Sequence, residues 1–162
     1  MTKKWYVLQV TTGKEITVKN ALERKGYEIL VPLIEKQVRK KGAWHTSLEV
    51  MFGGYVFIRL QYRWTDYYRI CKIPNVIKIL GGGQNPVPLT SEEIKTIHII
   101  DKLRSISVVT FDDKGNLIPL NGILAMFKDR LISFKRRQKR AVIEIEIAKT
   151  KTRITVPFTE TV

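Results

Sequence analysis

Short runs of aromatic and β-branched residues alternate with segments of helical apolar spacing over the first hundred residues. The run Tyr55-Val56-Phe57-Ile58-Arg59-Leu60 is the strongest strand signal, because nearly every side chain in it is aromatic or branched. Such a nearly continuous apolar run is typical of a strand buried on both faces. The other runs predict strands over 5–10, 27–32 and 76–80, and the helical spacing predicts helices over 14–25, 64–71 and 90–103.

Two local signals add detail to this pattern. Thr90-Ser91-Glu92-Glu93 is a capping box, with Thr90 as the N-cap and Glu93 at the third helical position. Residues 33–42 run from apolar into basic, which predicts a strand that enters a hairpin turn, and residues 43–52 return as its partner. Strands that alternate with three helices predict an α/β sandwich, and hence an α+β fold class for the chain.

The pattern changes after Leu103. Residues 105–114 are expected to form a connector that ends in the turn Asp113-Lys114-Gly115. Beyond it only short strand-like runs remain, which predicts a small C-terminal β-barrel. These runs are 117–120, 123–127, 130–134, 140–147 and 153–157. We therefore expect a first domain over 1–104, a linker over 105–113 and a barrel over 114–162.

The charge of the chain indicates a polyanionic partner. There are 29 Lys and Arg against 15 Asp and Glu, which gives a formal net charge of +14. Both parts are positive, with 18 basic and 9 acidic residues up to residue 105 and 11 basic and 6 acidic residues beyond it. Because 44% of the residues are hydrophobic, the charge surrounds a folded core. Nucleic acid, an anionic membrane and an acidic protein all remain open as partners.

Several classes of protein are excluded by what the chain contains. A single cysteine, Cys71, cannot form an intramolecular disulfide and fits a reducing cytosol. The N-terminal residues lack an apolar stretch of signal-peptide length, and no uncharged run of about 18 apolar residues could span a bilayer. We expect a cytoplasmic monomer that makes no use of a membrane.

Reactive side chains are scarce. His45, His98 and Cys71 have no partner at the spacing of a metal site, so packing or surface roles are expected for each. Gly81-Gly82-Gly83 lacks the Lys-Ser or Lys-Thr that would follow in a phosphate-binding loop. We expect no catalytic residue, no metal, no cofactor and no enzymatic activity.

Two basic segments stand out from this background. The segment 135–140 carries five cations in six residues between two predicted strands, so a hairpin end would present them to phosphates. A solubilising turn is the alternative reading. The weaker segment, Lys36 with Arg39-Lys40-Lys41, fits a nucleic-acid contact or a solvated turn equally well. The predicted RNA-binding residues are Lys135, Arg136, Arg137, Lys139, Arg140, Lys151 and Arg153.

Aromatic residues form a third signal. Tyr55 and Phe57 share one face of their predicted strand because side chains alternate with a period of two, and Phe52 comes just before it. Most of these rings are expected in the core. A concave apolar patch for a partner helix is the alternative for the set.

Seven signatures along residues 4 to about 100 together resemble the N-terminal domain of NusG-family transcription elongation factors. They occur in the family's order and spacing. They are Trp5-Tyr6-Val7, Thr12-Gly13-Lys14-Glu15, Leu30-Val31-Pro32, Arg39-Lys40-Lys41-Gly42, Phe52-Gly53-Gly54-Tyr55-Val56-Phe57, Ile73-Pro74-Asn75-Val76 and Pro86-Val87-Pro88-Leu89. The segment 122–141 is similar to the KOW motif of the same family, with Ile123 in place of its usual proline and Met126 in place of a glycine. The resemblance implies an α/β sandwich followed by an SH3-like β-barrel.

The resemblance also implies a function. The N-terminal domain would dock an apolar patch onto the clamp helices of the largest RNA polymerase subunit, and Phe52, Tyr55 and Phe57 match the patch by motif. Contact with the non-template DNA strand stays open. Some members read this strand through an Asn-Thr pair, but Lys72-Ile73 stands in its place here, so the sequence-dependent pausing of those members is not expected. The basic segment 135–140 resembles the LoaP type of antitermination factor, which implies recruitment through an RNA hairpin in a nascent leader transcript.

A barrel hairpin that offers cations without an aromatic stacking platform suits base-paired RNA better than a flexible single strand. Two other functions stay open. One is a general NusG-type elongation factor whose KOW domain binds proteins. The other is a ribosome-associated RNA-binding protein, since KOW barrels also occur in that class. The operon and the RNA that would be targeted are not encoded in any pattern above.

Overall fold

The computed structural model describes residues 3–161, and its contacts group the chain into two compact units. The first unit holds the chain up to residue 31, then 52–97 and 146–150. The second holds 32–51, 98–145 and the chain from 151 onward. Each unit is thus assembled from separate stretches of chain. The domain boundaries expected at 104 and 114 remain a prediction.

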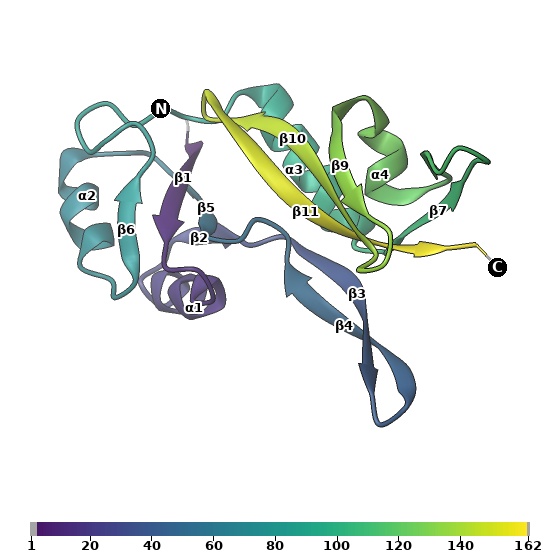
Figure 1. Ribbon diagram of the computed structural model, residues 1–162. Helices are drawn as coiled ribbons and strands as arrows, with labels where there is room; N and C mark the ends of the chain where they lie inside the picture. The colour runs from purple at the N-terminus through teal and green to yellow at the C-terminus, as the bar shows by residue number, and fades with distance from the viewer. Residues whose placement is uncertain (1–2, 162) are drawn as a thin grey trace. The chain divides into compact units, whose positions relative to one another are not determined.

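A four-stranded antiparallel sheet forms the centre of the first unit (Figure 1). Its strand order is β2-β5-β1-β6, so β5 and β1 are the inner strands. The strands are β1 (Lys4–Val10), β2 (Glu28–Leu30), β5 (Tyr55–Leu60) and β6 (Val76–Ile79). All four were predicted, and the observed ends differ by at most two residues. Val56, Phe57 and Ile58 are fully buried, which confirms that β5 is covered on both faces.

Helices complete the first unit. α1 (Glu15–Arg24) packs against β2 and β5 through its buried Val18 and Leu22, which lie one helical turn apart. α2 (Trp64–Cys71) packs against β6 and has the predicted bounds. α3 (Ser91–Leu103) begins in this unit with the predicted capping box. The Thr90 backbone N–H donates to Glu93 Oε1 at 2.9 Å, and the Glu93 N–H donates to Thr90 Oγ1 at 3.1 Å.

The second unit contains the predicted basic hairpin. β3 (Leu33–Lys40) and β4 (Ala43–Val50) pair along their whole length, from Leu33 opposite Val50 to Lys40 opposite Ala43. The two turn residues, Lys41 and Gly42, have φ values of 51° and 76°. Positive φ at both central positions is the requirement of a type I′ hairpin turn, which matches the twist of the strands.

A curled five-stranded sheet accounts for most of the remaining chain (Figure 1). Its order is β8-β7-β11-β10-β9, with β7 and β11 parallel and the β7–β8 and β9–β10 pairs antiparallel. The strands are β7 (Ser107–Phe111), β8 (Leu117–Pro119), β9 (Leu131–Lys135), β10 (Arg140–Ile147) and β11 (Thr150–Glu160). β11 is longer than the predicted 153–157.

Two predicted elements in this region are wrong. The connector expected over 105–114 contains β7, because Val109 is fully buried and β7 pairs with the end of β11. The strand expected over 123–127 is a short helix, α4 (Gly122–Met126), followed by the 3₁₀ turn η1 (Lys128–Arg130). Periodicity cannot distinguish a helix from a strand in so short an apolar run.

Tertiary contacts select the helical form of this run. Gly122 has a φ of 72° and sets the direction of the chain into α4. The buried Ser107 hydroxyl accepts a hydrogen bond from the Leu124 backbone N–H at 3.2 Å, which satisfies a donor in the first turn of the helix. Ile123 and Leu124 are then buried together. No helix within residues 3–161 is both long enough and apolar enough to cross a membrane.

Candidate interaction sites

Two of the three predicted polymerase contacts belong to the core of the first unit. Phe57 is fully buried on β5, and Phe52 is buried just before that strand. Their ring centroids are 5.3 Å apart with planes at 86°, an edge-to-face arrangement that stabilises aromatic pairs. Tyr55 is partly exposed. Tyr55 is therefore the member of the set that can contact a partner without rearrangement of the core.

A buried carboxylate fixes the turn that leads into Tyr55. Glu15, at the start of α1, is only 3% exposed and accepts hydrogen bonds from two backbone amides. The Gly54 N–H donates to Oε2 at 2.8 Å, and the Gly13 N–H donates to Oε1 at 2.9 Å. Gly54 has a φ of 85°, so a side chain there would be strained. The Phe52-Gly53-Gly54-Tyr55 segment is consequently held in one conformation.

A surface hollow lies beside this turn, and its lining includes Tyr55, Thr11, Thr12, Gln9 and Ile77. Ile77, on β6, is 57% exposed, so its side chain is available to a partner that covers the hollow. Sequence patterns did not predict Ile77 as a contact. Its only signal was an isoleucine on the outward face of a short strand.

The basic segment 135–140 forms the end of β9, a turn and the start of β10, and we call residues 136–139 the basic turn. Lys139 has a φ of 56°, and its N–H donates to the Arg136 carbonyl at 3.1 Å, which closes the turn. Lys135 and Arg137 are exposed, and neither makes an ion pair within residues 3–161. Both can therefore contact an anion directly. Lys151, on β11, is exposed in the same way.

Other members of the predicted RNA-binding set already have partners. Arg136 pairs with Glu160 at 2.8 Å, and its guanidinium lies 4.1 Å from the centroid of the Phe111 ring. Arg153 lies 3.6 Å from a Glu144 oxygen and is largely exposed, so its ion pair is loose. These two arginines would have to give up contacts before they could bind phosphate.

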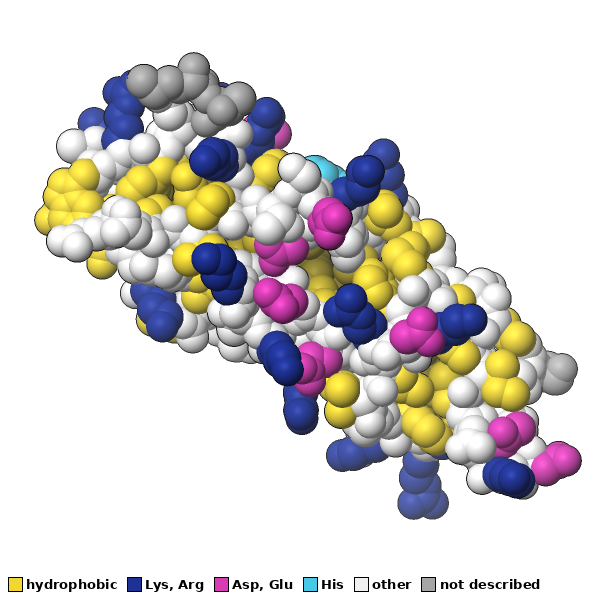
Figure 2. All heavy atoms as spheres, turned by 90° about the horizontal axis from the view of Figure 1, so that it is seen from above, with side chains coloured by type: hydrophobic (Ala, Val, Ile, Leu, Met, Phe, Trp, Pro, Cys, Tyr) yellow, Lys and Arg dark blue, Asp and Glu magenta, His cyan; other side chains and the backbone are white. Residues whose placement is uncertain are grey.

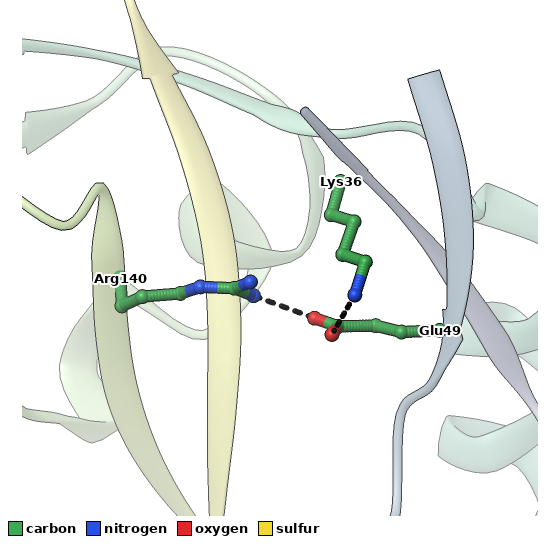
Figure 3. A network of polar contacts seen from close by, with 3 residues as sticks. All are labelled: Lys36, Glu49 and Arg140. Atoms are coloured by element: carbon green, nitrogen blue, oxygen red, sulfur yellow. Dashed lines mark hydrogen bonds and ion pairs between the residues drawn. The ribbon is translucent and has the colours of Figure 1, made fainter. Parts of the chain in front are cut away.

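Arg140 is held more firmly, in a group of three charged residues (Figure 3). Its Nη1 lies 2.5 Å from Glu49 Oε1, and Lys36 Nζ lies 3.3 Å from Glu49 Oε2. Each of the three side chains is less than one third exposed. One carboxylate thus joins β3, β4 and β10, and we call these residues the Glu49 triad. The triad links the basic hairpin to the basic turn within the second unit.

An exposed tryptophan completes this region. Trp44, on β4, has the Lys139 ammonium 5.1 Å and the Arg39 guanidinium 5.9 Å from the centroid of its ring. Sequence patterns did not connect the two basic segments and did not predict a role for Trp44. The available signal was a large aromatic residue beside a basic hairpin turn, but its neighbour Lys139 lies 95 positions away along the chain.

Basic side chains are also present outside the basic turn and the basic hairpin. Figure 2 shows basic side chains scattered over one face with apolar side chains between them. On this face the basic side chains form no single large patch, so local clusters such as the basic turn are the more specific feature of the charge. No group of three or more His, Cys, Asp or Glu suited to a metal ion occurs in the part of the chain that the structure describes.

Comparison with known proteins identifies the family. A family model described as transcription termination factor NusG matches residues 3–98. The chain is 29% identical to the transcription termination/antitermination protein NusG of Campylobacter jejuni, over 78% of this chain and 77% of that protein. It is 27% identical to the protein of the same name from Buchnera aphidicola, over 96% and 93% of the two chains.

A solved structure titled "Domain interaction in Thermotoga maritima NusG" has the same fold. It matches with a TM-score of 0.55 at 18% identity and covers 97% of this chain and 94% of that one. The expected fold class, an α/β sandwich followed by an SH3-like barrel, is thus confirmed. Because the family model matches more than half of the residues, the chain belongs to the NusG family of transcription termination factors.

Proposed function

We propose that this chain is an antitermination factor that binds RNA polymerase through its first unit and structured nascent RNA through the basic turn. Family membership supports a role in transcript elongation or termination. The observation that carries the RNA assignment is the pair of exposed, unpaired cations Lys135 and Arg137 on one hairpin end. This specialisation corresponds to the LoaP-like resemblance of the sequence.

The polymerase contact in this proposal centres on Tyr55 and the hollow beside it. The clamp helices of the largest subunit would bury the Tyr55 ring and the exposed Ile77. Phe52 and Phe57 would support the surface from within the core. Glu15 would hold the turn that presents Tyr55.

The test of this contact is the affinity of Tyr55→Ala for polymerase. Loss of an aromatic anchor typically costs about 2 kcal/mol, which is roughly a thirtyfold weaker complex. Tyr68→Ala is the matched control, because it removes an exposed tyrosine from α2. Undiminished binding by a folded Tyr55→Ala variant would overturn the assignment of Tyr55.

The RNA contact is tested by transcription past a terminator. We expect a Lys135→Gln, Arg137→Gln, Lys151→Gln variant to lose read-through, because each exposed cation that meets a phosphate releases counterions. The control replaces three exposed lysines of the first unit by glutamine, namely Lys14, Lys25 and Lys95. It lowers the net charge by the same three units as the test variant. Unchanged read-through by the folded triple variant would reject recruitment by RNA.

Crosslinking in growing cells, followed by sequencing of the bound RNA, separates the alternatives. A few leader transcripts would support the proposed antitermination factor. Binding to all nascent transcripts would favour a general NusG-type factor. Enrichment of ribosomal RNA would favour a ribosome-associated protein.

A further inference from the structure

Trp44 is an exposed aromatic ring on a rigid support. It lies on β4 opposite Arg39, in a hairpin paired over its full length, and is 55% exposed. Most tryptophans bury their large apolar surface, so a ring with this much exposed area is available for a stacking contact. The cations of Arg39 and Lys139 both lie within 6 Å of the centroid of its ring.

A cavity of about 180 Å³ lies between Trp44 and the basic turn. All of its lining belongs to the second unit. The residues that line it on the polar side are Lys36, Gln37, Arg137, Gln138, Lys139 and Arg140, and the described lining includes no Asp or Glu. An aromatic wall, amide groups and uncompensated cations therefore border one space.

The Glu49 triad holds this space open without adding negative charge to it. Glu49 is neutralised by Lys36 and Arg140, and these contacts fix β3 and β4 against the start of β10 (Figure 3). Arg39, Arg137 and Lys139 make no ion pair within the described residues. The platform and its cations are thus preorganised by residues that do not themselves need to bind the ligand.

We infer that Trp44 is a stacking platform for one unpaired base of RNA, whose neighbouring phosphates are bound by Lys139, Arg137 and Arg39. The inference rests on the proposed RNA contact of the basic turn. Stacking of a base on an aromatic ring is stronger than an exposed cation–π contact, so the base displaces the two cations from the ring toward the phosphates. The amides of Gln37 and Gln138 lie where they can contact the edge of the base.

This site changes the kind of RNA that the protein is expected to select. Cations alone do not select an unpaired base, because they contact phosphates irrespective of pairing. With an aromatic platform beside them, the preferred ligand is a hairpin that carries an unpaired nucleotide next to its stem. An acidic peptide could satisfy the cations but has no aromatic face to match Trp44.

The test compares two RNA hairpins of equal length with the full chain. One is fully paired, and the other has a single unpaired adenosine in its stem. We expect the second to bind about fivefold or more tightly, the lower end of what base stacking contributes. Replacing the unpaired base by the fluorescent analogue 2-aminopurine should give quenching on binding, because stacking on indole quenches its emission.

Variants at Trp44 separate stacking from charge. Trp44→Leu should abolish both the preference and the quenching while the affinity for the paired hairpin stays unchanged, and Trp44→Phe should keep most of the preference. Trp64→Leu is the matched control, because Trp64 is also exposed but lies on α2 in the first unit. Both leucine substitutions are at exposed sites, and the cooperativity of thermal unfolding checks that the variants are folded.

Three results would overturn the inference. If Trp44→Leu keeps the preference, the base does not stack on Trp44. If the wild-type chain binds both hairpins equally, the platform is unused and the proposed contact of the basic turn stands. If the corresponding DNA hairpin, or poly-glutamate, binds as tightly with the same Trp44 dependence, the ligand is not specifically RNA.

A separate arm detects failure of the proposed function itself. If neither hairpin binds, the hairpin-recruitment proposal fails. A short unpaired RNA oligonucleotide is then used with wild type and Trp44→Leu. Binding that depends on Trp44 would support the base site independently of the hairpin, and an absence of binding would reject both.

Discussion

The aromatic set of the first unit and the basic turn of the second unit were both predicted as binding sites from residue type. In the aromatic set burial decides which residues can bind, whereas in the basic turn ion pairing decides it. Of Phe52, Tyr55 and Phe57, the two phenylalanines are buried in the core and only Tyr55 is partly exposed. In the basic segment, Arg136 and Arg140 are held by carboxylates, while other cations remain exposed.

The difference shows why predicted binding residues of each kind can become unavailable to a partner in the folded protein. Aromatic rings are drawn into the core because removing their large apolar surface from water is strongly favourable. Cations stay at the surface, and only those with a nearby carboxylate are immobilised. A mutation at a buried ring therefore tests stability, whereas a mutation at an exposed cation tests binding. The following predictions use this contrast, from the largest expected effect to the smallest.

Phe57→Ala should have the largest effect, on stability. Truncation of a fully buried phenylalanine typically costs about 3–5 kcal/mol, because a cavity remains. Tyr55→Ala should lower the free energy of unfolding by less than about 1.5 kcal/mol, since that ring is partly exposed. Urea denaturation measures both. A Phe57→Ala protein with wild-type stability that fails to bind polymerase would show that Phe57 is itself a contact.

Glu15→Ala should come next. The substitution leaves the buried Gly54 backbone amide without its acceptor, and an unsatisfied buried donor costs about 1–3 kcal/mol. The Gly13 amide also loses its acceptor, but Gly13 is exposed and can bond to water instead. Polymerase binding should weaken as well, because the turn before Tyr55 loosens. Glu23→Ala is the control, since Glu23 is exposed on the same helix. Equal stability of the two variants would mean that Glu15 does not hold the turn.

Arg140→Gln and Arg137→Gln should affect different properties, protein stability in the first case and RNA binding in the second. Arg140→Gln should lower stability by about 1 kcal/mol, since it removes a partly buried ion pair, and should leave the salt dependence of RNA binding unchanged. Arg137→Gln should keep stability within about 0.5 kcal/mol. It should reduce the slope of log affinity against log salt by about one unit. If Arg140→Gln reduces this slope as much as Arg137→Gln does, the two arginines do not differ in their contact with RNA.

The smallest effect concerns pH. Hydrogen bonds to Asp112, first of all from the Asn116 backbone N–H, hold the pKa of this carboxyl below its usual value. Because the pKa is lower in the folded state than in the unfolded chain, the ionised carboxylate stabilises the fold at pH values above the ordinary pKa of an aspartate. That stability is lost as pH falls from about 4 through the lowered value.

Asp112→Asn should remove this contribution, so its free energy of unfolding should fall less than that of the wild type between neutral and acidic pH. Because Asp112 is exposed on the β7–β8 turn, the difference is expected to be small. Parallel pH profiles of the two proteins would contradict the assignment.

Local signals in the sequence were sufficient for much of the fold. The bounds of α2, the capping box at Thr90 and the type I′ turn at Lys41-Gly42 depend on neighbours within four positions, so the chain specifies them locally. The nearly continuous apolar run at 55–60 also predicted that β5 is buried on both faces, as an inner strand is. The same rules could not assign β7 or α4, because short apolar runs adopt whichever form satisfies their distant partners.

For the candidate sites, the sequence determined which residue types are present and which family they match, and the tertiary structure decided which of them face solvent. Glu49 immobilises Arg140 from a strand 91 positions away, and Trp44 meets Lys139 across a similar separation. Such pairings follow from the packing of whole strands, and no pattern with a period of two or 3.6 encodes them. The placement of Trp44 beside the basic turn therefore could not be predicted from local signals and arises only in the folded chain.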